Sequence, residues 1–95
     1  MTITFGTHDV SCPWAIEDMM LHAFIVQKTL TMYDAEYWVI HSPRVPDEDG
    51  DDWYHINIYI ASGENLNEYA MREIKDVVDH FNTRDYCVAK FEDYL

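Results

Sequence analysis

The stretch WYHINIYI, residues 53–60, decides the fold of this chain. Isoleucine and aromatic side chains recur there at every second position, as in a strand that buries one face and leaves the other outside the core. We therefore expect a strand over these residues. Its core-facing set is Tyr54, Ile56, Ile58 and Ile60, and its outward set is Trp53, His55, Asn57 and Tyr59.

A second strand is expected just upstream, over residues 36–41, which read EYWVIH and are rich in strand-forming side chains. Ser42 and Pro43 are expected to end it, because proline cannot donate a ladder hydrogen bond. We expect Tyr37, Val39 and His41 to stand on the outward face, beside Tyr59. The residues between the two strands, 45–52, would then form a long acidic hairpin loop.

Two helices flank this hairpin. Pro13 follows Ser11 and Cys12 as a helix start, and the apolar spacing predicts one buried stripe down to about residue 26. Residues 25–32 fit either the last helical turns or an extra strand. Asn65 and Glu68 mark the start of a second helix that ends near Asn82. The first stripe comprises Ile16, Met19, Met20, Ala23 and Phe24, and the second comprises Leu66, Tyr69, Ala70, Ile74, Val77, Val78 and Phe81.

Short strands are expected at both ends of the chain, over residues 2–5 and 86–91. The complete order is strand, helix, strand, strand, helix, strand. That order predicts an α+β fold in which two helices cover one face of an antiparallel sheet, in the ferredoxin-like arrangement. A chain of 95 residues has room for one core, so we expect a single domain over residues 1–95.

Charge is the most informative feature of the composition. The chain has 18 acidic and 6 basic residues and a formal net charge of -12. Such a field repels phosphate backbones and anionic membrane surfaces, which bind proteins through lysine and arginine. We therefore expect neither direct nucleic-acid binding nor membrane association. Because Cys12 and Cys87 do not form a disulfide framework, we expect free thiols and a cytoplasmic protein, in the host cytoplasm if a phage encodes it.

The hairpin loop carries five carboxylates in the six residues 47–52. Calcium sites need this density of oxygen ligands, but an EF-hand would require glycine and glutamate where the chain has Asp52 and Ile58. Three interpretations remain: a solvated hairpin tip, a docking surface for a basic partner and, less favoured, a cation site. We expect no metal and no cofactor.

No motif in the sequence indicates catalysis. The three glycines lie outside any phosphate-binding pattern, and no histidine or cysteine spacing matches a zinc site. Nothing in the sequence places a thiol beside an imidazole either, as a nucleophile and its base would require. We therefore expect a protein that is not an enzyme.

These properties predict an acidic inhibitor that occupies the basic groove of a nucleic-acid-binding protein or complex, as phage anti-CRISPR or anti-restriction proteins do by DNA mimicry. A small module that dimerises through its sheet and binds proteins without mimicry is the alternative. Clustered carboxylates would imitate the charge density of a duplex, and aromatic side chains would anchor the complex. The candidate partner-binding residues are Glu17, Asp18, Asp34, Glu36, Tyr37, Asp47, Glu48, Asp49, Asp51, Asp52, Trp53 and Tyr59.

Overall fold

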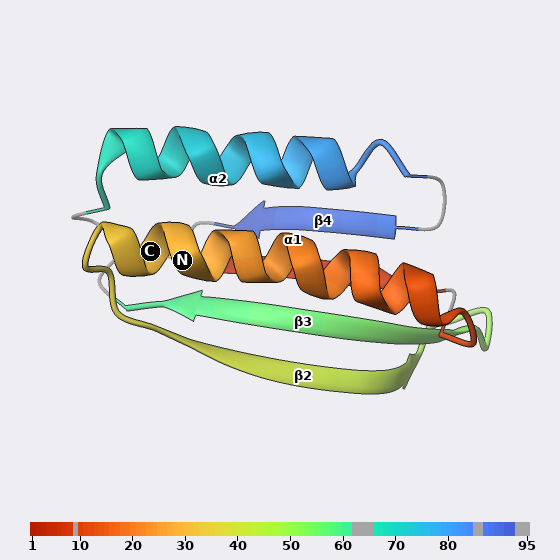
Figure 1. The fold of residues 1–95 in the computed structure, drawn as a ribbon. Helices are drawn as coiled ribbons and strands as arrows, with labels where there is room; N and C mark the ends of the chain where they lie inside the picture. The colour runs from red at the N-terminus through yellow and green to blue at the C-terminus, as the bar shows by residue number, and fades with distance from the viewer. Residues whose placement is uncertain (9, 62–65, 85–86, 93–95) are drawn as a thin grey trace.

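The computed structural model describes residues 1–8, 10–61, 66–84 and 87–92. They form a single α+β domain with four antiparallel strands and two helices (Figure 1). This confirms the predicted order of strands and helices. The elements are β1 (Thr2–Thr7), α1 (Pro13–Met32), β2 (Tyr37–Pro46), β3 (Asp52–Ile60), α2 (Glu68–Phe81) and β4 (Cys87–Glu92).

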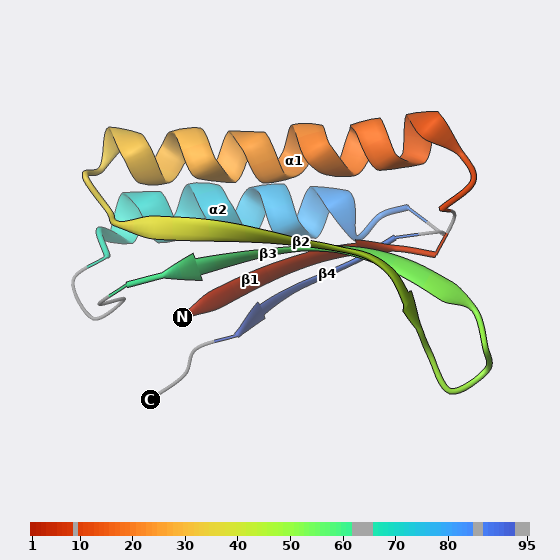
Figure 2. The ribbon, with the colours of Figure 1, turned by 90° about the horizontal axis from the view of Figure 1, so that it is seen from below.

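The sheet has the order β2-β3-β1-β4, and every neighbouring pair is antiparallel. Both helices lie on the same side of it, with α2 toward β4 and α1 beside α2 (Figures 1 and 2). Within the described residues, no helix lies on the opposite side of the sheet, which we call the open face (Figure 2). At its tip the β2–β3 hairpin bends away from the helices, toward this open face.

The core lies between the helices and the inner face of the sheet. Ile56, Ile58 and Ile60 are buried there, as the alternation in residues 53–60 predicts. Phe5 from β1 meets Phe81 from α2 edge to face, with the ring centroids 5.3 Å apart. This contact ties α2 to the sheet.

Helix α1 continues without a break to Met32, so residues 25–32 are helix and not an extra strand. Its predicted buried stripe is only partly correct. Met19 and Ala23 are buried, but Met20 and Phe24 are exposed. Apolar residues occur on both sides of this helix, so helical spacing alone could not identify the inner side. The residues it buries are Ala15, Met19, His22, Ala23, Val26, Thr29 and Leu30.

Strand β2 runs past Pro43 to Pro46, so the prediction that Ser42 and Pro43 end it is wrong. The pairing with β3 shifts register between Ser42 and Val45, and Arg44 has a positive φ of 56°. An edge strand tolerates proline at such a bulge because one row of its backbone donors needs no partner. The acidic hairpin loop is correspondingly shorter, residues 47–51.

Helix α2 begins at Glu68, and Asn67 caps it by accepting a hydrogen bond from the Tyr69 backbone N–H at 2.8 Å. Asn65 itself lies outside the described residues, but the prediction that it caps the helix is wrong, because residues 66 and 67 are not helical. Ala70, Ile74, Val78 and Phe81 are buried as expected, whereas Tyr69 is exposed. Neither helix in the described ranges has an apolar stretch that could cross a bilayer.

Candidate functional site: the open face of the sheet and the acidic hairpin

The open face of the sheet carries a ladder of aromatic side chains. Trp38 of β2 stacks on Tyr59 of β3, with the ring centroids 5.6 Å apart and an interplanar angle of 16°. Trp38 is 53% exposed, and its neighbour Ile40 is 47% exposed. Because large apolar side chains at this exposure cost solvation free energy, such a face is typical of a binding surface.

The register of β2 corrects one predicted binding residue. Tyr37 pairs with Ile60 and Val39 with Ile58, so these side chains share the helix-covered face. The Tyr37 hydroxyl lies 3.3 Å from Thr31 Oγ1 of α1. The prediction that Tyr37, Val39 and His41 face outward is therefore wrong.

A second stack lies at the hairpin end of the open face. Trp53 and His55 are parallel within 12°, and their ring centroids are 5.9 Å apart. His55 lies across Gly6 of β1, where an added Cβ would meet His55 Cδ2 at 2.7 Å. The ring can lie flat on the sheet only because residue 6 has no side chain.

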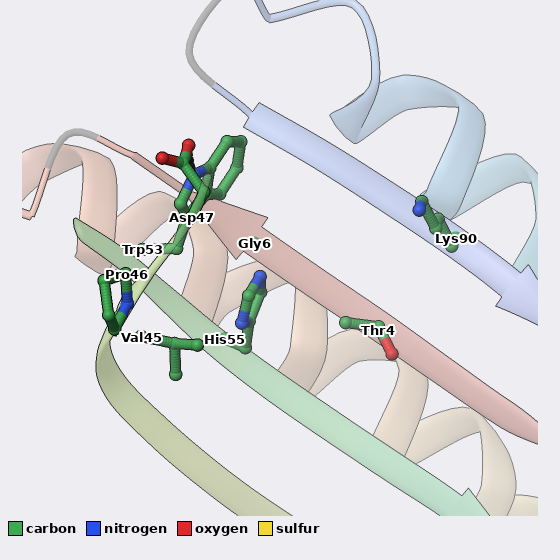
Figure 3. A pocket seen from close by; sticks show the side chains of 8 residues that line it. All are labelled: Thr4, Gly6, Val45, Pro46, Asp47, Trp53, His55 and Lys90. Atoms are coloured by element: carbon green, nitrogen blue, oxygen red, sulfur yellow. Dashed lines mark hydrogen bonds between the residues drawn. The ribbon is translucent and has the colours of Figure 1, made fainter. Parts of the chain in front are cut away.

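A pocket of about 500 Å³ opens beside this second stack (Figure 3). Val45 and Pro46 form one wall, where the hairpin bends toward the open face. Lys90 stands on β4, across β1 from that wall, and supplies a positive charge. The pocket is lined by Thr4, Gly6, Val45, Pro46, Asp47, Trp53, His55 and Lys90.

Asp47 joins the acidic hairpin loop to this pocket. Its Oδ1 accepts hydrogen bonds from the backbone N–H groups of Asp49 and Asp51, both at 2.9 Å. Its Oδ2 accepts a hydrogen bond from Trp53 Nε1 at 2.8 Å. The loop is therefore organised around the Asp47 carboxylate, which also binds the Trp53 indole. Gly50 forms the turn at the tip of the loop, with a φ of 84°.

Local contacts shift the acidity of two groups in the site. The hydrogen bond from Trp53 lowers the pKa of Asp47 below its ordinary value of 3.8, and backbone N–H groups of the loop add to this effect. Burial lowers the pKa of His55, with a smaller contribution from the Lys90 charge. Asp47 is thus held as an anion, and His55 is favoured in its neutral form near pH 7.

The predicted acidic residues do not gather on one surface. Glu48, Asp49 and Asp51 are exposed in the hairpin loop, which Asp47 joins to Trp53. Asp34 and Glu36 lie at the other end of the molecule, where β2 begins. The ten residues of β2, about 33 Å long at a strand's rise per residue, separate the two groups.

The acids at the start of α1 differ from each other. Glu17 is exposed, whereas Asp18 pairs with Arg84 of the turn after α2. The side chains of Asp18 and Arg84 are only 21% and 23% exposed. The Asp18 carboxylate is therefore used in an ion pair within the fold. Asp52 also has a partner, since its Oδ2 lies 3.9 Å from Arg44 Nη1.

The described part of the chain shows no metal-binding cluster, since no three His, Cys, Asp or Glu side chains converge there. Cys12 is a free thiol, as expected. The side chain of Cys87 lies outside what the structure describes. The site therefore combines a charged loop, two aromatic stacks and an open pocket, which are features typical of a surface that binds another molecule.

The residues of this site that sequence reasoning did not assign to it include Trp38, Ile40, Gly6 and Lys90. Trp38 and Ile40 alternate with Tyr37 and Val39, and both sets are apolar, so no local signal showed which set faces outward. Gly6 and Lys90 join the site only through the pairing of β1 with β3 and β4. No protein-family model matches the chain, and neither a curated protein nor a solved structure matches it.

Proposed function

We propose that this protein is an acidic inhibitor that docks its hairpin loop and the open face of its sheet into the basic groove of a nucleic-acid-binding protein or complex. The observation that carries the proposal is the hydrogen bond from Trp53 to Asp47, which holds the charged loop at the edge of the open face. Charge would steer the encounter, and the aromatic side chains would be buried on docking.

The predicted acidic residues lie at two ends of the molecule, so only one group of them can imitate a continuous run of phosphates. Asp34 and Glu36 lie too far from the loop to extend the same charged surface. The loop alone supplies a short, dense array of carboxylates. We therefore propose that the loop replaces a few consecutive phosphates, while Trp38 and Tyr59 take the remaining contact area.

The same proposal includes two finer assignments. We infer a ferredoxin-like domain, because β3 lies between β1 and β2 and β1 lies between β3 and β4, all antiparallel. We also place the protein in the cytoplasm, where a nucleic-acid-binding target would be met.

Two variants of equal charge test the function. The first, E48Q/D49N/D51N, neutralises the loop but keeps Asp47, which organises it. The second, E73Q/D76N/D79N, neutralises three exposed acids of α2. Each raises the net charge by three, so a general charge effect would weaken binding equally in both.

The measurement is affinity capture from a host lysate, with the captured complex challenged by salt and by duplex DNA. We expect the loop variant to lose about tenfold or more in binding and the α2 variant to stay within about twofold. Duplex DNA should release the target from the unmodified protein. An equal loss of binding in the two variants, or a target that neither duplex DNA nor salt releases, would contradict the proposal. Either result would favour the alternative module, which binds proteins without mimicry.

A further inference from the structure

Helix α1 is apolar on both of its long sides. One side packs on the sheet and α2, and Met19, Val26 and Leu30 are fully buried there. The other side, which we call the outer face, is open to solvent: Trp14 is 57%, Leu21 55% and Met32 74% exposed. A helix that is apolar all round is normally buried all round, and surface helices place polar residues outside.

The outer face is a continuous strip and not a scatter of single residues. Trp14 and Leu21 are seven residues apart, which places them two turns apart on one line of the helix. Met32 lies five turns from Trp14, on nearly the same line. The outer face consists of Trp14, Glu17, Leu21, Phe24, Lys28 and Met32.

The charges of this face are balanced, unlike those of the whole chain. Glu17 and Lys28 carry opposite charges on its two halves. Neither is in an ion pair within the described residues, and Lys28 lies over the Phe24 ring at 5.7 Å. A partner for this strip must therefore present apolar side chains with one acid and one base.

A second copy of α1 meets this requirement when it runs antiparallel. We propose that two copies of this chain pair through the outer faces of α1, about a two-fold axis that crosses the helices at the height of residues 22 and 23 along the chain. Glu17 of each copy then lies opposite Lys28 of the other, and Leu21 opposite Phe24. Trp14 packs beside Met32. This is the self-complementary contact that two-fold symmetry requires.

The surface available fits a reversible dimer. Large aromatic side chains carry ~150–250 Å² each, so the half-exposed strip offers on the order of 500 Å² of apolar area. A stable interface buries ~800 Å² on each partner, and the flanking residues of α1 supply part of the difference. We therefore expect a weak, reversible dimer that forms only at micromolar or higher protein concentrations.

Salt separates this inference from the proposed function. Two copies of charge -12 repel each other at long range, and salt screens that repulsion while leaving apolar contacts intact. Dimerisation should therefore strengthen with salt. Docking of the acidic loop to a basic groove should weaken with salt, so either proposal can fail while the other stands.

The experiment is sedimentation velocity on the full chain from about 1 to 300 μM, at low and high salt. L21E should abolish the dimer. E17K should raise the dissociation constant about tenfold, since it places two lysines opposite each other at both ends of the seam, and E17K/K28E should restore it. Y69S, at an exposed tyrosine of α2, is the matched control and should change nothing.

Each variant should remain folded, because all the substituted side chains are exposed. Circular dichroism melts check this. A protein that stays monomeric over the whole concentration range would overturn the inference. A dimer that survives L21E, or a charge swap that fails to restore what E17K loses, would place the contact on another surface and overturn it equally.

Discussion

At the scale of single residues, Asp47 and Gly6 shape the candidate site by opposite means. Asp47 acts through what it binds: one oxygen organises the loop and the other holds the Trp53 indole. Gly6 acts through what it lacks, since any side chain there would collide with the His55 ring. Both residues place aromatic groups of β3, and neither needs to contact a partner itself.

The Asp47–Trp53 bond has a measurable signature in the acidity of the carboxyl group. Because the indole N–H is the main cause of the lowered pKa, W53F should raise the Asp47 pKa toward 3.8, as followed by carboxyl carbon NMR. W38F, at the other open-face tryptophan, is the control and should leave it unchanged. An Asp47 pKa that does not move in W53F would show that the indole does not bind this carboxylate.

The sign of the pH effect follows from the lowered pKa. A carboxyl whose pKa is depressed in the folded state stabilises that state above its unfolded pKa near 3.8. That contribution falls as the pH drops through the folded value. The loop should therefore keep its order at neutral pH and lose it only in acid.

At the scale of elements, the two helices differ in what defines them. Helix α2 is amphipathic, so its buried face and its end near Asn82 follow from local rules, although its cap is Asn67 and not the predicted Asn65. Helix α1 begins at Pro13, its cap residue Cys12 makes no side-chain cap hydrogen bond, and it is apolar on both sides. Its inner face is selected by contact with the sheet.

The cap of α2 makes a stability prediction. N67A should lower the free energy of unfolding by about 1 kcal/mol, because the Tyr69 backbone N–H loses its acceptor. N67D should retain most of the stability, since a carboxylate accepts the same bond and suits the positive end of the helix. Chemical denaturation measures both, and an N67A protein as stable as the parent would mean that the cap contributes nothing.

At the scale of the whole molecule, one ion pair links the two helical segments. Arg84, after α2, contacts Asp18 of α1 and also donates a hydrogen bond to the His80 carbonyl at 2.9 Å. The guanidinium carbon lies 5.9 Å from the centre of the Phe81 ring. These contacts close the end of the core opposite the start of α2.

Removing this link should cost more than removing an exposed pair. R84M should lower the free energy of unfolding by about 1–3 kcal/mol, because the largely buried Asp18 carboxylate loses the Arg84 guanidinium. R44M breaks the exposed pair with Asp52 and should cost less than about 1 kcal/mol. Denaturant curves on the two variants test this order, and the reverse order would contradict it. D18N/R84M should recover part of the loss, since an amide leaves no buried charge.

What the sequence by itself determined is local. Alternation in residues 53–60 identified β3 and its inward isoleucines, and helical spacing identified α2, because strand and helix periods are properties of neighbouring residues. The chain order and the single α+β domain followed from those elements. The acidic residues of the hairpin loop are likewise identified from the sequence alone.

Only the tertiary structure decided which face each ambiguous element presents. In β2 both alternating sets are apolar, and pairing with β3 turned Tyr37 inward and Trp38 outward. In α1 both sides are apolar, and packing on the sheet and α2 buried Met19 while leaving Phe24 exposed. The same folding placed Asp34, which precedes β2, at the end of that strand opposite the hairpin loop. The physical reason is the same for both elements: a period shows that an element has two faces, but only long-range contacts select the buried one.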